Sequence, residues 1–149
     1  MTTIFSRIIA GELPGRFVWA DDDCAVFASI APLADGHLLV VPRIEVARFT
    51  DADPNLFAHL AAVAQIVGRA CELAFPGTRA TLLIAGFEVP HLHLHVVSVQ
   101  RESQLNFANA RNDASAAQLD HAVEKVRWAL IQMGHGAQVT ARPDATALA

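Results

Sequence analysis

The chain has 149 residues, of which 53% are hydrophobic and 17% are charged. This length and composition suit one domain with a substantial core. The formal net charge of -4 leaves no basic surplus to neutralise a phosphate backbone, which argues against nucleic acid as a partner. A small phosphate ligand stays compatible with this charge, because backbone N–H groups can bind an anion locally.

The cysteines and the N-terminus indicate the compartment. Cys24 and Cys71 have no spacing typical of a disulfide framework or of paired metal ligands, so we expect two reduced, buried thiols. The first residues lack the long apolar run of a signal peptide, and no stretch approaches the roughly 18 apolar residues of a membrane span. We therefore expect a cytoplasmic protein that does not contact a membrane.

The first part of the chain predicts a short helix and three strands. Apolar residues with helical spacing predict the helix over residues 4–10. Strands at residues 16–20 and 24–29 flank an acidic turn, a pattern typical of a hairpin. A third, apolar strand at residues 37–41 follows another turn and stops at a proline.

A long helix comes next. Asp53 is a typical N-cap residue, and Pro54 suits the first helical position. The apolar residues that follow recur every three or four positions as far as residue 74, which predicts a helix packed over a sheet. Two further strands are predicted at residues 80–85 and 91–99.

The C-terminal part predicts one more helix and a tail. Ser115 and Gln118 form a capping box in front of an apolar stripe. We assign residues 1–135 to a single domain and expect residues 136–149 to form a flexible C-terminal tail, because they offer little to bury. Short links favour antiparallel pairing, so the predicted fold class is α+β: an antiparallel, about five-stranded sheet with one long helix packed on it and a C-terminal helix.

Three histidines share one face of the last predicted strand. Side chains alternate along a strand, so His91, His93 and His95 point one way and the apolar residues between them point the other way. Adjacent imidazoles that were all charged would repel one another, so at least one stays neutral near pH 7. A neutral imidazole is a nucleophile and a proton carrier, and the cluster therefore predicts a catalytic site.

Two chemistries use such a cluster. In the first, one histidine attacks phosphorus and forms a covalent intermediate that water then cleaves. In the second, the histidines ligate zinc or a similar metal that activates water, with Glu45 or Glu88 as a further ligand. The spacing of the histidines alone does not separate the two.

The sequence around these histidines resembles the histidine-triad (HIT) nucleotide-binding family. The family signature alternates three histidines with apolar residues and ends on two apolar residues, and residues 91–97 match it at every position. Residues 4–14 resemble the family's N-terminal segment, and residues 27–32 and 36–42 resemble the two parts of its next segment. Together these matches run through roughly the first two-thirds of the chain in the family's order, which makes the resemblance specific.

The resemblance implies a HIT-like fold and a nucleotide-binding hydrolase or transferase. Its substrates would be nucleotide conjugates attacked at the α-phosphate, either nucleoside phosphoramidates or dinucleoside polyphosphates. By position, His93 would be the nucleophile that forms a nucleotidyl-histidine intermediate, with its other nitrogen held by a backbone carbonyl. His95 would contact the phosphate and help to protonate the leaving group, and His91 would orient the cluster. The ligand would be a purine nucleotide or its conjugate, the protein would be a homodimer, and no cofactor is implied.

The resemblance also implies a nucleotide pocket. Four apolar side chains match positions that line the base pocket: Phe5, Ile8, Phe27 and Ile30. Ordinary core packing explains each of these four as well. Ser29 stands where the family often has an aspartate for the ribose hydroxyls, and Gly86 would bring the backbone close to the phosphate.

Other positions depart from the family. Many members bind structural zinc through N-terminal cysteines and a histidine after the third strand. Here those positions read Phe5-Ser6 and Arg43-Ile44-Glu45, so we predict no structural zinc. The loop before the triad lacks the usual asparagine and glutamine and carries Glu88, which would repel a phosphate unless it faces away or holds a histidine. These changes affect the substrate more than the reaction type.

Three hypotheses therefore stay open from the sequence. The first is a nucleotidyl hydrolase that uses His93 covalently. The second is a catalytically weak purine-nucleotide-binding module, because the groups that would recognise the ribose and the leaving group are altered. The third is a metal-dependent hydrolase whose ligands are the triad itself.

Overall fold

The computed structural model describes residues 2–141, and its centre is one antiparallel sheet with the strand order β1-β2-β3-β5-β4. The strands are β1 (Phe17–Ala20), β2 (Cys24–Ala28), β3 (Leu38–Pro42), β4 (Arg79–Leu83) and β5 (Leu94–Val99). The helices are α1 (Ile4–Ile9), α2 (Pro54–Ala74), α3 (Ala116–Gln132) and α4 (Gly136–Thr140), and the short 3-10 helices are η1 (Phe49–Asp51), η2 (Glu102–Gln104) and η3 (Phe107–Asn109). The predicted α+β class is confirmed.

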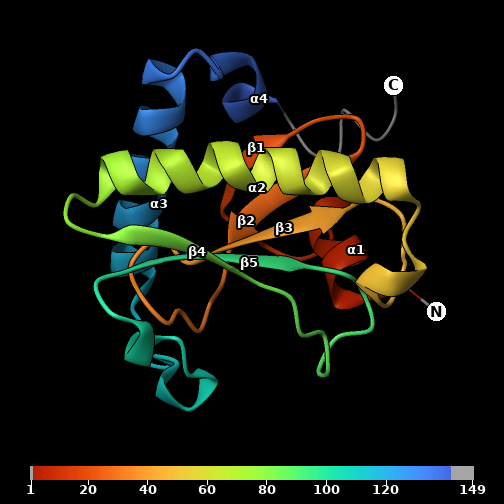
Figure 1. Cartoon of the computed structure of the whole chain (residues 1–149). Coiled ribbons are helices and arrows are strands. Elements are labelled where there is room, and N and C mark those ends of the chain that lie inside the picture. The colour runs from red at the N-terminus through yellow and green to blue at the C-terminus, as the bar shows by residue number, and fades with distance from the viewer. Residues whose placement is uncertain (1, 142–149) are drawn as a thin grey trace.

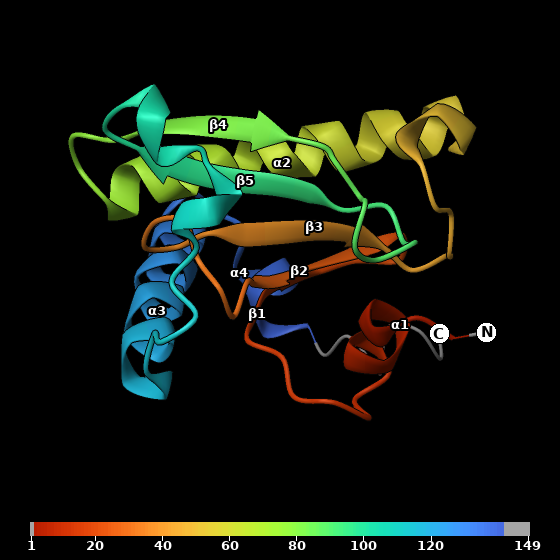
Figure 2. The ribbon, with the colours of Figure 1, turned by 90° about the horizontal axis from the view of Figure 1, so that it is seen from below.

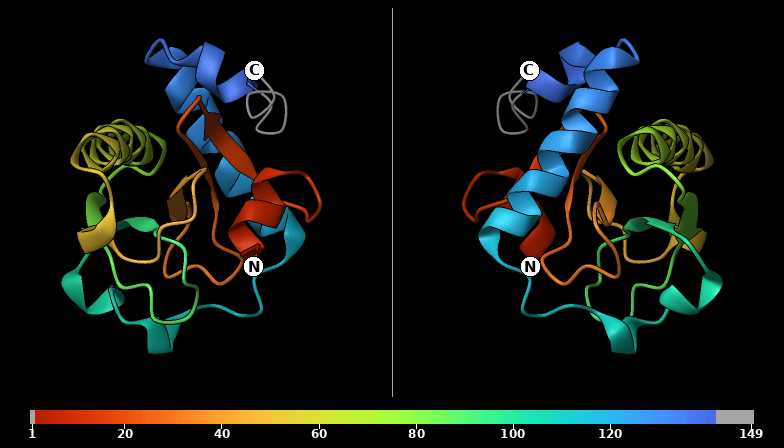
Figure 3. Two further views of the ribbon diagram at one scale, coloured as in Figure 1. Left: turned by 90° about the vertical axis from the view of Figure 1, so that its right-hand side faces the viewer. Right: turned by 90° about the vertical axis from the view of Figure 1, so that its left-hand side faces the viewer.

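The helices lie on both sides of the sheet. The long helix α2 runs along one face, and α3 packs beside it (Figure 1). The short helix α1 covers part of the opposite face (Figure 3). Seen from below, residues 84–93 and 100–114 also lie over this second face (Figure 2). The face away from α2 therefore holds the loops that lead into and out of β5.

The strand register explains how two cores form from alternating residues. Val26, Val40 and Leu94 are neighbours across three strands, and all three pack into the core shared with α2 and α3. The adjacent row across the same three strands consists of Phe27, Leu39 and His95. Phe27 and Leu39 pack on α1. His95 is thus carried to the α1 face by the alternation that the sequence predicts.

The predicted helix starts are confirmed by their caps. The Asp53 carboxylate accepts hydrogen bonds from the backbone N–H groups of Asn55 and Leu56, and Pro54 occupies the first helical position of α2. Ser115 and Gln118 form the reciprocal capping box of α3. These caps satisfy backbone donors that a helix leaves unpaired, so they set where each helix begins.

The histidine segment begins its strand later than predicted. The ladder of β5 starts at Leu94 and not at residue 91. Before it, the His91 N–H donates to the Val89 carbonyl in a tight turn, and the Leu92 N–H donates to the Val46 carbonyl at 2.7 Å. The loop after β3 therefore takes the hydrogen bonds that a neighbouring strand would use. The alternation survives, because Leu92 still packs into the core on the α2 side.

Two other expectations differ from the structure. Residues 136–140 form the short helix α4, and Val139 packs against the main core, where the sequence predicts a flexible tail from residue 136. Positions 142–149 of that tail lie outside the described residues. The second difference concerns α2, because the sequence predicts no stretch apolar enough to span a membrane. By length and composition α2 meets that threshold, but its buried residues belong to the main core.

Candidate active site

A cleft of about 390 Å³ opens beside the histidines on the α1 face. Both His93 and His95 line this cleft, whereas His91 is completely buried behind it. The structure also brings five of the predicted nucleotide-pocket residues into its wall: Phe5, Ile8, Phe27, Ser29 and Ile30. Gly86, the sixth, does not line it, although its φ of 82° is the left-handed conformation that favours glycine.

His91 is fixed by hydrogen bonds at both ring nitrogens. Its Nε2 lies 2.7 Å from the Pro42 carbonyl oxygen, which only accepts, so Nε2 carries the proton. Its Nδ1 then accepts from the Thr3 hydroxyl at 2.6 Å. Burial lowers the pKa of His91 and keeps the ring neutral. His91 is therefore a structural ring that joins β3 to the start of α1.

His93 is held in one tautomer by the backbone of its neighbour. Its Nδ1 lies 2.7 Å from the carbonyl oxygen of His91, so Nδ1 carries the proton and donates it. In the neutral ring this leaves a lone pair on Nε2. The Phe5 ring packs edge-on against His93 at 4.9 Å between centroids and limits its rotation. This arrangement matches what a nitrogen nucleophile requires.

His95 receives its tautomer from His37, a residue that sequence reasoning does not single out. The Leu33 N–H donates to His37 Nδ1 at 3.0 Å, so the proton of neutral His37 is on Nε2. That proton points at His95 Nδ1, 2.9 Å away, and the proton of neutral His95 must then be on Nε2. His95 is thereby set as a hydrogen-bond donor at the nitrogen opposite His37.

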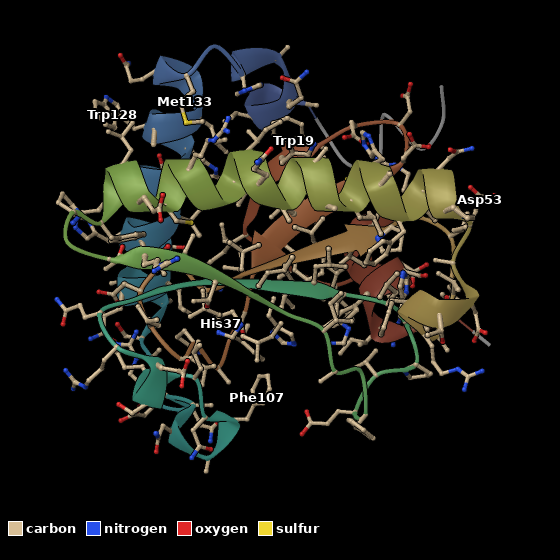
Figure 4. The ribbon with its side chains drawn as sticks, in the orientation of Figure 1. Trp19, His37, Asp53, Phe107, Trp128 and Met133 are labelled. Atoms are coloured by element: carbon tan, nitrogen blue, oxygen red, sulfur yellow. The ribbon has the colours of Figure 1, made fainter. Side chains whose placement is uncertain are left out.

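A second unpredicted neighbour of His95 is Phe107. The Phe107 ring on η3 lies 5.1 Å from the His95 ring, edge to face, and the side chain stays 48% exposed. Figure 4 shows His37 and Phe107 on the same side of the sheet, away from α2. The sequence places His37 at the start of a predicted strand and in the segment 36–42 that resembles the family, without indicating a contact with the triad, and it offers no signal for Phe107.

We call the hydrogen-bonded pair of His37 and His95 the relay. Burial keeps both of its rings neutral. It lowers the pKa of His37 to about 3 and that of His95 to about 4, with further lowering from the neighbouring imidazoles. At pH 7 both rings are therefore uncharged. The tautomers derived above require this neutral state, because a protonated ring donates from both nitrogens.

These lowered pKa values predict an acid-sensitive fold. Above about pH 6.5 both histidines are neutral whether the chain is folded or not, and they add no pH dependence. As the pH falls from 6.5 to 5, His37 and His95 become protonated in the unfolded chain but stay neutral in the folded chain. Each histidine then reduces the free energy of unfolding by up to about 1.4 kcal/mol per pH unit. Urea titrations at several pH values across this range give the free energy of unfolding as a function of pH.

This free energy should fall less steeply with decreasing pH in His37→Gln than in wild type, and an unchanged steepness would contradict the neutral state of the relay. His121→Asn, which removes an exposed histidine, is the control and should behave as wild type.

The positions where many HIT proteins hold structural zinc form a hydrogen-bonded cluster instead. The Glu45 carboxylate accepts from the Thr3 N–H at 2.7 Å and from the Ser6 hydroxyl at 2.6 Å. These two hydrogen bonds lower the pKa of Glu45. Hydroxyl and carboxylate oxygens without a thiol do not fit the Cys and His set typical of structural zinc. The cluster ties α1 to the loop after β3 and, through Thr3, to His91.

One group of three potential metal ligands occurs within residues 2–141, and it does not include the triad. It consists of Asp21, Cys24 and His59, whose ligand atoms lie within 4.8 Å of one another. The Asp21 carboxylate already accepts from Trp19 Nε1 at 2.8 Å and pairs with His59 Nε2 at 2.9 Å. Burial raises the pKa of the Cys24 thiol far above its ordinary value. We interpret this cluster as a hydrogen-bonded link between the β1–β2 turn and α2.

The triad geometry also opposes the metal hypothesis. Both nitrogens of His91 have hydrogen-bond partners, and Nδ1 of His93 and of His95 is engaged as well. Only one nitrogen on each of two rings stays free for a ligand. A site of three imidazoles on one ion therefore does not form in this arrangement.

Alternating histidines that flank a cleft on one face of an antiparallel sheet define a histidine-triad site. A family model described as the HIT domain matches residues 10–102. An uncharacterized HIT-like protein of Mycobacterium tuberculosis is 31% identical over 113 residues, covering 72% of this chain and 78% of that protein. The chain therefore belongs to the HIT family.

Solved structures agree with this assignment. The chain is similar to a zinc-bound histidine triad family protein from Mycobacterium smegmatis, with a TM-score of 0.78 and 27% identity over 91% of this chain and 98% of that one. It is also similar to a hypothetical histidine triad nucleotide-binding protein from Sulfolobus tokodaii, with a TM-score of 0.75 and 25% identity over 87% and 92% of the two chains.

Proposed function

We propose that this HIT protein is a nucleotidyl hydrolase or transferase that acts at the α-phosphate of a nucleotide conjugate through a covalent bond to His93. The observation that carries the proposal is the hydrogen bond from His93 Nδ1 to the His91 carbonyl, which in the neutral ring places the lone pair on Nε2, in a residue that lines the cleft. The apolar wall of Phe5, Ile8 and Phe27 suits the flat face of a purine base. The name of the Sulfolobus relative, a nucleotide-binding protein, agrees with such a ligand.

The proposed reaction has two steps that balance in protons and bonds. In the first, the lone pair of His93 Nε2 forms a bond to the α-phosphorus, and the bond from phosphorus to the leaving group breaks. The departing group takes a proton from solvent, while the His95 Nε2–H donates a hydrogen bond to it and stays in place. In the second step, water attacks the phosphorus, the bond to His93 breaks, and the water releases its proton to solvent, so that both rings return to their starting state.

The proposal is tested with adenosine 5′-phosphoramidate. Release of AMP should be measured with and without a chelator, and acid-quenched samples should be examined by mass spectrometry for a nucleotidyl adduct on the peptide that carries His93. We expect turnover that survives chelation, together with an adduct at His93. Turnover without any adduct would argue against the covalent route, and turnover abolished by the chelator would favour the metal hypothesis.

A second candidate function is nucleotide binding with little catalysis. The observation that favours it is Ser29, whose hydroxyl oxygen already accepts from the Ala31 N–H at 3.2 Å and lacks the charge of an aspartate for gripping a ribose. Under this hypothesis AMP binds in calorimetric titration while no phosphoramidate or dinucleotide is cleaved. Triad-dependent turnover would exclude it.

We also propose that the chain forms a homodimer through the edge of the sheet. Among residues 2–141, strand β4 pairs only with β5, so its other edge carries no strand of the described chain. Beside it, a groove of about 270 Å³ between α2 and β4 is lined by small residues such as Gly68 and Ala80, and Leu82 is 51% exposed. An open strand edge next to an apolar groove is a ready surface for a second copy.

The dimer has a direct test in light scattering after gel filtration. Wild type should elute with twice the chain mass of 16.0 kDa, and Leu82→Arg should reduce the mass to that of one chain. The control is Leu73→Arg, because Leu73 on α2 is 47% exposed but does not line the groove beside β4. A wild-type monomer, or a dimer that Leu82→Arg leaves intact, would contradict the proposal.

A further inference from the structure

Of the charged side chains in the wall of the histidine cleft, one forms an ion pair and the other does not. Two residues of the wall carry a formal charge at pH 7, Arg16 and Glu88. The Arg16 guanidinium is paired, because its Nε donates to the Asp120 carboxylate at 2.7 Å. Glu88 is exposed and forms no ion pair with any residue in the described part of the chain. The only unpaired charge in the wall is therefore negative.

The histidines do not offset this charge. His95 in the cleft and His37 behind it are neutral at pH 7, for the reasons of burial given above. The donor that this arrangement provides is the neutral N–H of His95 Nε2. Such a donor suits a substrate with a single charged phosphate, whereas a chain of phosphates carries further negative charges, and the one cation of the described wall, Arg16, is already paired with Asp120.

Glu88 lies in the wall of the cleft that His93 and His95 also line. Glu88 and Val89 line the same cleft as His93 and His95, and the chain passes from them through Pro90 directly to His91. Val89 packs against the cluster that contains Phe5 and Phe27, so this loop is anchored to the cleft wall. Glu88 is therefore held in the wall of the same cleft, where its negative charge acts on a ligand bound there.

We infer that Glu88 makes this site selective for nucleoside phosphoramidates of amines, above all of diamines that keep a free, positively charged ammonium group, and against dinucleoside polyphosphates. The carboxylate attracts a cationic leaving group and repels a polyphosphate one. This inference rests on the proposed function. It narrows the two substrate classes left open by the sequence to one.

The test compares three substrates that share the adenosine 5′-phosphoryl group. The first carries butylamine, the second carries 1,4-diaminobutane with one free ammonium group, and the third is diadenosine tetraphosphate. In wild type we expect kcat/KM to be about fivefold to tenfold higher for the diaminobutane conjugate than for the butylamine conjugate, and lowest for the tetraphosphate. Since Glu88 is exposed, about 0.5 M salt should shrink the difference between the two amines.

Three variants isolate the charge. Glu88→Gln should bring the two amine conjugates to equal kcat/KM and raise that of the tetraphosphate about tenfold. Glu88→Lys should reverse the preference between the amines. Glu102→Gln, an exposed glutamate on η2 that does not line the cleft, should retain the wild-type preference.

The outcomes separate this inference from the proposed function. If none of the three substrates is cleaved by wild type, the proposed function itself fails. If they are cleaved with a triad-dependent adduct but the preference among them is the same in wild type, Glu88→Gln and Glu88→Lys, the enzyme stands and the role of Glu88 is wrong. A wild-type preference for the tetraphosphate over both amines would also overturn the inference.

Discussion

Replacing His93 with alanine is expected to lower kcat/KM for an adenosine phosphoramidate by about 10³-fold or more. The variant lacks the nitrogen that we propose as the nucleophile, so no phosphorus–nitrogen bond forms at this position. The hydrogen-bond donor at His95 and the binding pocket remain, and they give only weak catalysis without it. Steady-state release of AMP measures the rate, and the adduct seen by mass spectrometry in wild type should be absent.

Two controls make this result specific. His121→Ala removes an exposed histidine on α3, far along the chain from the triad, and should retain wild-type turnover. Calorimetric titration with AMP should show that His93→Ala still binds the nucleotide, because its base-pocket residues are untouched. Full activity in His93→Ala would remove the covalent mechanism and leave the binding module or another nucleophile to be considered.

Replacing Gly36 with alanine is expected to destabilise the fold by about 3 kcal/mol. Gly36 has a φ of 77°, a left-handed conformation that costs an L residue about 1–2 kcal/mol. An added Cβ would also lie 2.4 Å from Cε2 of Phe75, the residue that ends α2. That ring packs against the main core, so the clash adds an overpacking cost of about 1–3 kcal/mol. Urea denaturation measures the change.

Gly77→Ala is the matched control. Gly77 has a φ of 84°, but an added Cβ there meets nothing within 4 Å. It should therefore show the backbone cost alone, about 1–2 kcal/mol. Equal losses in the two variants would mean that Phe75 moves aside freely and that the packing between Gly36 and the end of α2 is not tight. Because His37 follows Gly36, the Gly36→Ala variant should also weaken the link between His37 and His95.

Local chemistry in the sequence accounts for much of this fold. Asp53 and Ser115 mark the helix starts because a capping side chain acts on backbone groups only two or three residues away. The alternation at residues 91–95 predicts correctly that His93 and His95 line the cleft and that Leu92 packs into the core on the other side, whereas His91 is buried instead of lining the cleft.

What the sequence does not reveal are contacts between distant residues. The hydrogen bond between His37 and His95 joins positions 58 residues apart, and no local pattern encodes it. The same is true of Thr3 and His91, which are 88 residues apart. The late start of β5 depends on the Val46 carbonyl, which competes for a backbone N–H that the periodicity had assigned to a strand. Phe107 reaches His95 only because a loop folds back over the sheet.

The proton positions in the histidine cluster are anchored by the main chain at each end. The Leu33 N–H directs His37, the Pro42 carbonyl directs His91, and the His91 carbonyl directs His93. No side chain outside the cluster decides which nitrogen donates and which accepts. A substitution in the wall of the cleft, such as one at Glu88, therefore leaves these main-chain contacts in place. Changes of substrate preference and changes of proton position require substitutions in different parts of the molecule.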